Sequence, residues 1–462
     1  MFKRVLVANR GEIACRILRT LERLGIESVA VFSDADVAAP HVAAADQAFR
    51  LGPAPLAQSY LNPDLVLTAA LESGADAIHP GYGLLSENAA FAEKVRAAGI
   101  AFIGPPVSAL AAFGDKLRAR AVARSVGVEP PPGSDGPVSP ADVELLNTEA
   151  ARIGFPVLIK AAGGGGGIGM QIVREAAELA RAAQTCSDRG KAAFADERVY
   201  MERYLEGPRH IEVQVLCDEH GQAVALGERE CSVQRRHQKI IEESPSPASF
   251  FAGAEGAERR RKLHAAALEV VRAADYRGAG TVEFVSNAQG ELYFLEVNAR
   301  LQVEHPVTEA VTGLDLVEQQ LRVASGEMLA PQVLAAASCG HAVEARVYAE
   351  DPSRGFLPQP GRIEALSWPS GEGIRVDAGV SAGLEVTPHY DPMLAKIIAY
   401  GSTRAEAIAR LDAALAATEL RLVGPKGDRV TNLAFLRQVL ANAEFAGGDY
   451  DTGLAEKLVK RG

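Results

Sequence analysis

Short apolar runs alternate with segments of helical periodicity over the first hundred residues. The apolar runs predict buried strands, and apolar residues recurring every three or four positions predict helices. Strands are expected at 5–8, 29–32, 75–79 and 100–103, and helices at 13–24, 63–72 and 87–98. Such alternation is typical of a parallel sheet covered on both faces, a Rossmann-like unit. No Gly-x-Gly-x-x-Gly follows the first strand, which argues against a bound dinucleotide.

The middle of the chain has a different pattern. Residues 129–140 are rich in Pro, Gly and Ser and predict a loop or hinge. From Phe155 the pattern predicts a strand, a glycine run, a helix from 175 to 183 and two hairpins. The hairpins are expected to turn at 218–221 and 287–290.

Shorter strands characterise the last third, after about residue 335. They are expected at 343–349, 362–366, 375–378 and 394–400, and are followed by a helix at 404–417. This pattern predicts an antiparallel sheet with helices, a separate α+β domain.

Composition narrows the class of protein. The chain has 462 residues, too many for one compact core. Its formal charge of −11 argues against nucleic acid or an anionic membrane as a partner, and no segment has the ~18 apolar residues of a membrane helix. Since the five cysteines form no Cys-x-x-Cys pair, a zinc site or disulfide framework is not expected and a reducing cytoplasm fits. We expect them to be small buried hydrophobic residues.

The first candidate for chemistry is the stretch FPVLIKAAGGGGGIGM, residues 155–170. A glycine run lets backbone N–H groups approach phosphates closely. It is not a Walker loop, because its lysine, Lys160, precedes the glycines. The alternative is a flexible linker, but the run lies tightly between a strand and a helix, which favours phosphate binding.

A second candidate is the hairpin TVEFVSNAQGELYFLEVN, residues 281–298. Because side chains alternate along a strand, Glu296 and Asn298 should share one face, while Leu295 and Val297 point into a core. Glu283 on the preceding strand can lie on the same face as Glu296. Two carboxylates and an amide oxygen suit Mg²⁺. The alternative is a set of solvated acids on an exposed sheet face.

Two further stretches carry polar residues that could bind an anion. Residues 227–239 form either a solvated basic loop or an anion pocket, and they contain Arg229, Arg235, Arg236, His237 and Lys239. Residues 298–309 form either a capped turn with a surface salt bridge or a site where Arg holds a small anion and Glu removes its proton, and they contain Arg300, Gln302, Glu304 and His305.

Taken together, these stretches resemble the biotin carboxylase subunit or domain of biotin-dependent carboxylases over essentially the whole chain. The matching motifs, in order, are VANRGEIACRI, HPGYGLLSEN, GDK, the glycine run, MERYLEGPRHIEVQV, CSVQRRHQK, NARLQVEHPVTE and EARVYAEDP. The glycine loop and metal carboxylates are shared by many ATP-grasp ligases, whereas RRHQK, LQVEHPVTE and the arginine of EARVYAEDP are specific to biotin carboxylases.

The resemblance implies a multidomain α/β and α+β fold. It implies a Rossmann-like N-terminal domain at 1–114, an ATP-grasp domain at 115–333 with a lid at about 131–204, an antiparallel C-terminal domain at 334–447 and a tail at 448–462.

The same resemblance implies a role for each site residue. ATP contacts are implied for Lys116, Lys160, Gly166, Gly167, Glu202, Arg203, Leu205, His210, Gln234 and His237. Mg²⁺ or Mn²⁺ would be held by Glu283, Glu296 and Asn298, the first two of which also count among the ATP-binding residues. Bicarbonate would contact Lys239, Arg300, Gln302, Val303 and Glu304, and biotin would lie near Tyr82 and Arg346. The catalytic residues would be Arg300, Glu304, Lys239 and Arg346.

The implied reaction is ATP-dependent carboxylation of biotin, through carboxyphosphate, with Glu304 as base. The biotin is expected on a separate carrier protein, with a carboxyltransferase subunit and a homodimer of this chain as further partners. The expected role is the first half-reaction of an acyl-CoA carboxylase such as one acting on acetyl-CoA; alternatives are a pyruvate or other keto-acid carboxylase, or a longer chain of which this is a fragment.

This sequence departs from the family pattern at two places. Ile168 stands near the end of the glycine run, where relatives carry arginine or lysine, and Arg203 stands where bacterial relatives often have lysine. The loss of a charge at 168 is expected to weaken ATP binding. It also leaves open a non-catalytic nucleotide-binding paralogue, and the nucleotide site alone would fit another ATP-grasp ligase, of the carbamoyl phosphate synthetase or purine-pathway type.

Overall fold

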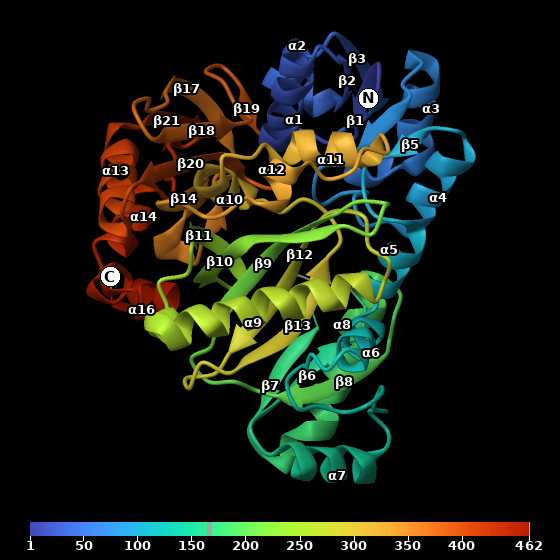
Figure 1. Ribbon diagram of the computed structural model, residues 1–462. Helices are drawn as coiled ribbons and strands as arrows, with labels where there is room; N and C mark the ends of the chain where they lie inside the picture. Colours follow the sequence, from blue (N-terminus) through green and yellow to red (C-terminus); the bar gives the residue numbers. More distant parts are fainter. Residues whose placement is uncertain (164–168, 462) are drawn as a thin grey trace.

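A five-stranded parallel sheet forms the N-terminal part of the computed structural model, which describes residues 1–163 and 169–461 (Figure 1). The strand order is β3-β2-β1-β4-β5, and each neighbouring pair is parallel. The strands are β1 (Arg4–Val7), β2 (Glu27–Ser33), β3 (Gln47–Gly52), β4 (Ala77–His79) and β5 (Ala101–Phe102). The expected Rossmann-like sheet is confirmed. Only β3 was missed, because the first four residues of this edge strand are exposed or half-buried and form no apolar run.

Helices cover both faces of this sheet, as parallel connections require. Val5 and Val7 belong to one core with Ile17 of α1, whereas Leu6 belongs to another with Phe91 of α4. The helices of this part are α1 (Gly11–Leu24), α2 (Pro40–Ala44), α3 (Pro63–Ser73), α4 (Ala89–Ala97) and α5 (Val107–Phe113).

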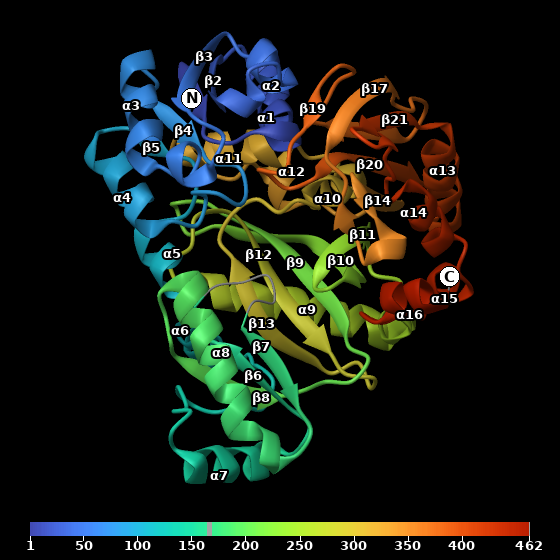
Figure 2. The same ribbon diagram turned by 180° about the vertical axis from the view of Figure 1, so that it is seen from behind.

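A small lobe, which we define as residues 143–163 and 169–203, projects from the rest of the molecule (Figures 1 and 2). Its antiparallel sheet has the order β7-β6-β8, and α7 and α8 share a core with it. The elements are α7 (Val143–Ile153), β6 (Val157–Ala161), β7 (Met170–Val173), α8 (Leu179–Phe194) and β8 (Val199–Arg203). The helix expected at 175–183 thus begins later and is longer, after one 3₁₀ turn at Ala176–Glu178. The short strands β7 and β8 were not predicted.

An eight-stranded antiparallel sheet forms the centre, in the order β13-β12-β9-β10-β11-β14-β20-β18. Both expected hairpins are present, as β9–β10 and β12–β13. The helices α6 (Lys116–Ser125), α9 (Gly253–Arg272), α10 (His305–Thr312) and α11 (Leu316–Ala324) surround this sheet. Its strands are β9 (Arg209–Cys217), β10 (Ala223–Arg235), β11 (Gln238–Ser244), β12 (Gly278–Ser286), β13 (Leu292–Asn298), β14 (His341–Tyr348), β18 (Ile374–Ala378) and β20 (Met393–Gly401).

The last third does not stand apart from this central sheet. Its strands β14, β20 and β18 extend the sheet from β11 onward, so the antiparallel sheet expected in the last third is continuous with the central sheet. The domain boundaries expected from the sequence stay a prediction. Without β14, strand β11 would be an open edge with unpaired backbone groups. A second sheet, β19-β17-β21-β22, belongs to the last third alone.

The remaining elements of the last third lie around these sheets. Helix α13 (Arg404–Ala417) has the bounds expected from the sequence. The others are β15 (Glu350–Asp351), β16 (Leu357–Pro358), β17 (Gly361–Ser367), β19 (Glu385–Val386), β21 (Glu419–Gly424), β22 (Gly427–Asp428), α14 (Leu433–Leu440), α15 (Ala443–Gly447) and α16 (Leu454–Arg461). The short helix α12 (Pro331–Leu334) directly precedes the last third.

The cysteines and the hydropathy of the helices complete the picture. Cys186, Cys217 and Cys231 are buried as expected, but Cys15 is half-buried and Cys339 is exposed, so the expectation of five buried cysteines is wrong for these two. Within residues 1–163 and 169–461, no helix is both long and apolar enough to span a membrane.

Candidate active site

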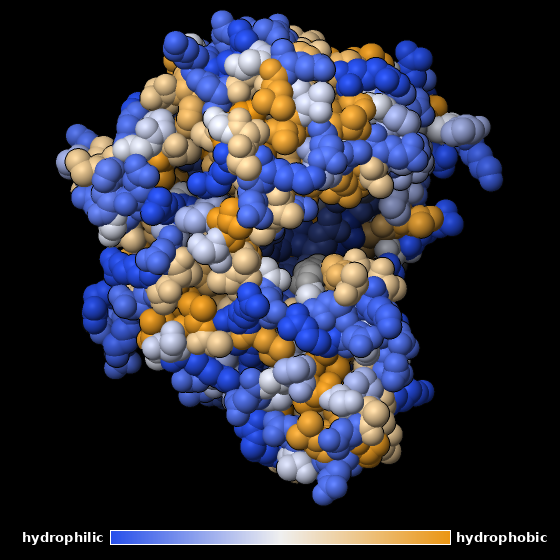
Figure 3. Space-filling view, turned by 90° about the vertical axis from the view of Figure 1, so that its right-hand side faces the viewer, coloured by the Kyte–Doolittle hydropathy of each residue, from blue (hydrophilic) through white to orange (hydrophobic). Residues whose placement is uncertain are grey.

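A cavity of about 470 Å³ lies between the small lobe and the β12–β13 side of the central sheet. Figure 3 shows the molecule hollowed above the small lobe, and the visible depth of the hollow is hydrophilic. Most of the residues that the sequence analysis assigned to a site line this cavity: Lys116, Lys160, Glu202, Arg203, Leu205, His210, Gln234, His237, Lys239, Glu283, Glu296, Asn298, Arg300, Gln302, Val303, Glu304 and Arg346. Gly166, Gly167 and Ile168 lie outside the described residues.

The expected metal carboxylates face each other on neighbouring strands. Glu283 and Glu296 are direct Cα partners, and Asn298 follows two residues later on β13. A β-bulge interrupts the ladder next to them, because Phe284 pairs with Phe294 and leaves Leu295 without a partner. A bulge breaks the alternation of side chains.

This bulge changes what the strand presents to the cavity. Leu295 lines the cavity together with Glu296, so the expectation that Leu295 points into a core is wrong. Val297, at 4% exposure, is buried as expected.

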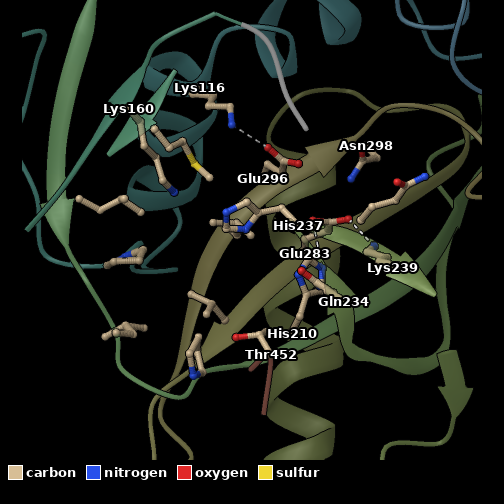
Figure 4. A pocket seen from close by; sticks show the side chains of 18 of the residues that line it. Lys116, Lys160, His210, Gln234, His237, Lys239, Glu283, Glu296, Asn298 and Thr452 are labelled. Carbon is tan, nitrogen blue, oxygen red and sulfur yellow. Dashed lines mark hydrogen bonds and ion pairs between the residues drawn. The ribbon is translucent and has the colours of Figure 1, made fainter. Parts of the chain in front are cut away.

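Two lysines reach the cavity from the side of α6 and the small lobe (Figure 4). Lys116 Nζ lies 3.3 Å from Glu296 Oε2. Burial opposes the charge of Lys116, but Glu296 outweighs it and raises the pKa of the lysine. Lys160 forms an ion pair with Glu202 on β8, yet burial lowers its pKa. Both lysines line this side of the cavity, where a bound anion would add a second negative partner for each ammonium group.

Lys239 lies at the centre of three carboxylates on the opposite side. Its Nζ donates to Glu212, Glu283 and Glu304 at 2.6, 2.9 and 2.6 Å. Burial works against its charge, but these carboxylates raise its pKa well above the ordinary value. Lys239 is therefore charged and fixes the position of Glu304 relative to Glu283.

His210 adds a second cation beside the same carboxylates. Its Nε2 lies 3.1 Å from Glu283 Oε2. Burial alone would lower the pKa of His210, but Glu283 opposes this and raises the pKa to about 9. At neutral pH His210 is therefore an imidazolium, a suitable donor to a phosphate.

Glu304 and Arg346 lie side by side in the lining of the cavity. Glu304 is 1% exposed and is the N-cap residue that precedes helix α10, and its Oε2 accepts from Arg346 Nη2 at 2.9 Å. Burial and Glu212 would raise the pKa of Glu304, but Lys239 and Arg346 lower it below the ordinary value. The group is therefore a carboxylate at neutral pH, able to accept a proton.

Arg300 is held in place by polar groups on several sides. Its guanidinium donates to Glu87, Gln302 and Asn298 at 2.8 Å each. This cage orients the planar donors of Arg300, which can bind a small anion bidentately.

The basic stretch 227–239 contributes less to the cavity than the anion-pocket interpretation implies. Arg229 is fully buried and bonded to Glu212, and Arg235 is paired with Glu350, so both are structural and the interpretation is wrong for them. Arg236 is exposed and does not line the cavity, whereas His237 and Lys239 do.

Two other candidate residues also lie elsewhere. His305 is buried in α10 and bonds through Nδ1 to Gln302 O, so it is structural. Tyr82 does not line the cavity, and its hydroxyl donates to Glu12. Glu12 lies 3.2 Å from Lys396, whose Nζ donates to Val303 O, so Tyr82 is connected to the site only through other residues.

Sequence reasoning missed several residues that line the cavity. They are Glu87, Pro131, Leu158, Met170, Tyr204, Pro208, Gln238, Val285, Leu295 and Thr452. Glu87 lies in the quoted motif HPGYGLLSEN and could have been found there. Thr452 comes from the tail, where its N–H donates to Pro208 O at 3.0 Å, and no local signal marks it.

Lysines on one side of a cavity and paired carboxylates on the other, enclosed between a small antiparallel sheet and a large one, suit the phosphates of a nucleotide and a divalent cation, as expected from the resemblance to ATP-grasp ligases. Family models extend this result. "Biotin carboxylase, N-terminal domain" matches residues 1–110, "Carbamoyl-phosphate synthase L chain, ATP binding domain" matches 115–332, and "Biotin carboxylase C-terminal domain" matches 344–457. The chain belongs to the biotin carboxylase family, and the resemblance seen in its motifs is confirmed.

Individual relatives agree with this assignment. The biotin carboxylase of Halalkalibacterium halodurans is 48% identical over 100% of this chain and 98% of its own. The propionyl-CoA carboxylase alpha chain of Ruegeria pomeroyi is 45% identical over 98% of this chain and 67% of its own. The biotin carboxylase domain of Hydrogenobacter thermophilus 2-oxoglutarate carboxylase, solved with MgADP and bicarbonate, has a TM-score of 0.93 at 42% identity, covering 99% of this chain and 98% of that one.

Membership of this family makes the chain an enzyme that carboxylates biotin. The family's cofactors are ATP, a divalent metal ion such as Mg²⁺, and biotin on a carrier.

Proposed function

We propose that this chain carries out the first half-reaction of an acyl-CoA carboxylase, by carboxylating carrier-bound biotin through carboxyphosphate. The observation that supports the path is the position of Glu304, whose carboxylate accepts from Lys239 at 2.6 Å and from Arg346 at 2.9 Å. Because Glu304 lies between Lys239 and Arg346, the bicarbonate that it deprotonates and the biotin anion proposed at Arg346 would form close to each other. The two steps would then need no large movement of the protein.

ATP would be held between the small lobe and the central sheet. Lys116 and Lys160 are placed to bind its phosphates from one side, and charged His210 from the other. Further contacts are proposed for Gly166, Gly167, Glu202, Arg203, Leu205, Gln234 and His237. The small lobe would close over the nucleotide as a lid and keep water from the intermediate.

The oxygen donors at the β12–β13 pair fit a hard divalent cation. Glu283, Glu296 and Asn298 supply two carboxylates and an amide oxygen on adjacent strands, the ligand type that Mg²⁺ and Mn²⁺ prefer. When bound, such an ion supplies positive charge beside the phosphates. Asn298 Oδ1 also accepts from Arg300, so the same amide connects metal-binding and anion-binding residues.

Bicarbonate would bind against Lys239, Arg300, Gln302, Val303 and Glu304. Glu304 takes the bicarbonate proton, and a bicarbonate oxygen then attacks the γ-phosphorus. An O–P bond forms to give carboxyphosphate, and the bond to the β-phosphate oxygen breaks to release ADP. Lys116, Lys160 and Lys239 stabilise the charge of the transferring group.

Biotin would react at Arg346, with Tyr82 farther away. Carboxyphosphate breaks into CO₂ and phosphate, and the phosphate takes the N1′ proton of biotin. Arg346 stabilises the enolate that results, and N1′ then bonds to the carbon of CO₂. The ordering of this guanidinium by Glu304 supports that role.

The proposed partners are a biotin carrier protein, a carboxyltransferase subunit and a second copy of this chain. The cytoplasmic location stays a prediction.

The proposed carboxyl acceptor is an acyl-CoA. The first curated relatives, at 45–48% identity, are biotin carboxylases and an acyl-CoA carboxylase chain, whereas the 2-oxoglutarate carboxylase domain is 42% identical, which favours an acyl-CoA acceptor. A keto-acid carboxylase is the second candidate, because that domain superimposes with a TM-score of 0.93. Because Lys239, Arg300, Glu304 and Arg346 all line the cavity, a non-catalytic paralogue is disfavoured.

Two measurements test the proposal. The purified chain should release ADP only when ATP, a divalent cation and bicarbonate are present, and it should release more when biotin is added. The native complex, captured through a tag on this chain, should transfer label from bicarbonate to acetyl-CoA or propionyl-CoA. Transfer to pyruvate or 2-oxoglutarate instead would reassign the acceptor, and absence of ADP release would reject the enzymatic function.

A further inference from the structure

Two buried glutamates lie directly opposite each other on neighbouring strands beside Arg346. Glu242 on β11 and Glu344 on β14 are Cα partners in the antiparallel ladder, and both are 0% exposed. Directly opposed residues have Cβ atoms about 4.5–5.5 Å apart and point to the same face of a sheet. That face is covered by helix α10, so water does not reach the pair.

Neither carboxyl is satisfied by hydrogen bonds. Among the described residues, none of their four oxygens has a hydrogen-bond partner. One ion pair reaches the two carboxyls, between Arg346 Nη2 and Glu242 Oε1 at 2.5 Å. Lys396, the cation whose charge acts most on Glu344, donates instead to Val303 O.

The charged groups around the pair do not neutralise two carboxylates. Arg346 is shared with Glu304, and Lys396 with Glu12. The titratable and charged groups that face the pair are Arg346 and Tyr348 on β14, Lys396 on β20, Lys239 on β11 and Glu304 at the start of α10. A second buried negative charge here would be uncompensated, which is strongly unfavourable.

We propose that Glu242 and Glu344 share one proton at neutral pH and act as a positioning pair for Arg346. With one proton shared, the pair carries a single negative charge, and Arg346 can bridge it and Glu304. Loss of that proton would give the pair two charges and draw the guanidinium toward Glu242, away from Glu304. Because this role concerns Arg346, it rests on the proposed function.

The electrostatics of the pair support this assignment. Burial raises the pKa of Glu242 to about 7, although Arg346 opposes the shift. Burial likewise raises the pKa of Glu344 well above its ordinary value, and the charge of Glu242 adds to that shift. Two interacting acids of this kind titrate as a unit, the second proton being lost at a higher pH than either acid alone would require.

The test is the pH dependence of biotin-stimulated ADP release in wild type and Glu344→Gln. In the wild type the rate should fall as the pair loses its last proton at alkaline pH. A glutamine at 344 can donate its amide to Glu242, and the pair then cannot reach two negative charges. The alkaline fall should therefore move up by at least about one pH unit, while ADP release without biotin keeps its profile.

A second variant tests positioning and guards against a folding failure. Glu242→Gln also leaves one carboxyl, so it should shift the profile in the same way. Because it removes one of the two ion-pair partners of Arg346, it should also lower kcat with biotin about tenfold without raising KM for ATP, and Glu242→Asp should restore part of the loss.

The matched control is Glu350→Gln. Glu350 is also buried and its pKa is also raised to about 7, but it pairs with Arg235. This variant should leave the alkaline fall where it is. If the profiles of Glu344→Gln and Glu242→Gln coincide with that of the wild type, the proton-sharing pair is wrong. A wild type without any biotin-stimulated ADP release would instead reject the proposed function.

Discussion

Glu283 and Glu296 stand opposite each other as Cα partners of β12 and β13, immediately before a β-bulge. Glu296 lies beside Lys116, while Glu283 contacts Lys239 and His210. Each carboxylate thus already has a cationic neighbour, from a different side of the cavity. Because these cations already balance part of the negative charge, a metal ion bound by Glu283 and Glu296 would need both carboxylates as charged ligands.

Replacing one of these charges should abolish most of the activity. Glu296→Gln keeps the size of the side chain but removes one ligand charge, so ADP release should fall more than tenfold, a rise in barrier of over about 1.4 kcal/mol. The measurement is ADP release at several Mg²⁺ concentrations, in which the Mg²⁺ requirement should also rise. Glu291→Gln, exposed at the turn of the same hairpin, is the control and should behave as wild type. Retention of more than a tenth of the activity by Glu296→Gln would mean that Glu296 holds no metal.

The base role of Glu304 leads to a second prediction. Glu304→Gln should stop bicarbonate-dependent ADP release and spare nucleotide binding, since its proposed task is to deprotonate bicarbonate. The pKa of Glu304 is held below its ordinary value, so the carboxylate should stay ionised into acidic pH. The wild-type rate should therefore lose the contribution of this base only at a pH below the ordinary pKa of a glutamate. Calorimetry with ADP and a rate assay on the same protein make the test. Lost nucleotide affinity with intact chemistry would contradict the assignment.

Arg346 should separate the two halves of the reaction. Arg346→Lys keeps a cation beside Glu304 and Glu242 but loses the planar fork that suits an enolate oxygen. Biotin carboxylation should fall about 100-fold, whereas bicarbonate-dependent ADP release without biotin should change less than about threefold. Arg375→Lys, in an ion-pair network away from the cavity, is the control for general effects of the exchange. Equal losses in both assays would move Arg346 to the phosphate site.

Much of this architecture was predictable because local pattern and fold agree. Strand β1 is apolar and buried from Val5 to Val7, and helix α13 buries residues at helical spacing and has Thr403 as its N-cap, so the positions of both follow from the sequence. The pairing of β12 with β13 and the shared face of Glu283 and Glu296 followed from strand alternation.

The sequence-based predictions were wrong where contacts between distant parts of the chain determine the position of a side chain. Arg229 has the same charge as Lys239, yet it is buried by contacts with Glu212 and Thr308 that lie far away in the sequence. Leu295 faces the cavity because of a bulge that strand alternation cannot reveal. Thr452 reaches the cavity only because the tail folds back onto Pro208.

A last prediction concerns stability and the network around Glu243. This carboxylate is 0% exposed and accepts from Arg404 at 2.6 and 2.9 Å and from Tyr450 at 2.5 Å, while His341 Nε2 lies 2.6 Å away. The network joins β11 of the central sheet to helix α13 and to the tail. Although burial alone would raise the pKa of Glu243, bonds from His341 and Arg404 lower it to about 2.

A carboxyl group whose pKa is lower in the folded protein than in the unfolded chain stabilises the fold at pH values above its unfolded-state pKa. That stabilisation is lost as the pH falls through the folded-state pKa. The network should therefore contribute fully above about pH 4.5 and be lost toward about pH 2, a change of roughly 3 kcal/mol in the free energy of unfolding. Urea titrations at several pH values measure it. Glu243→Gln should be less stable at neutral pH and show a shallower decline between about pH 5 and about pH 2, because its amide does not titrate. Glu258→Gln, on the exposed surface of α9, should keep the wild-type slope. If the free energy of unfolding of Glu243→Gln declined with pH as steeply as that of the wild type, the acid sensitivity of the fold would arise from other carboxylates. The network would then join β11 to the tail without a contribution from the charge of Glu243.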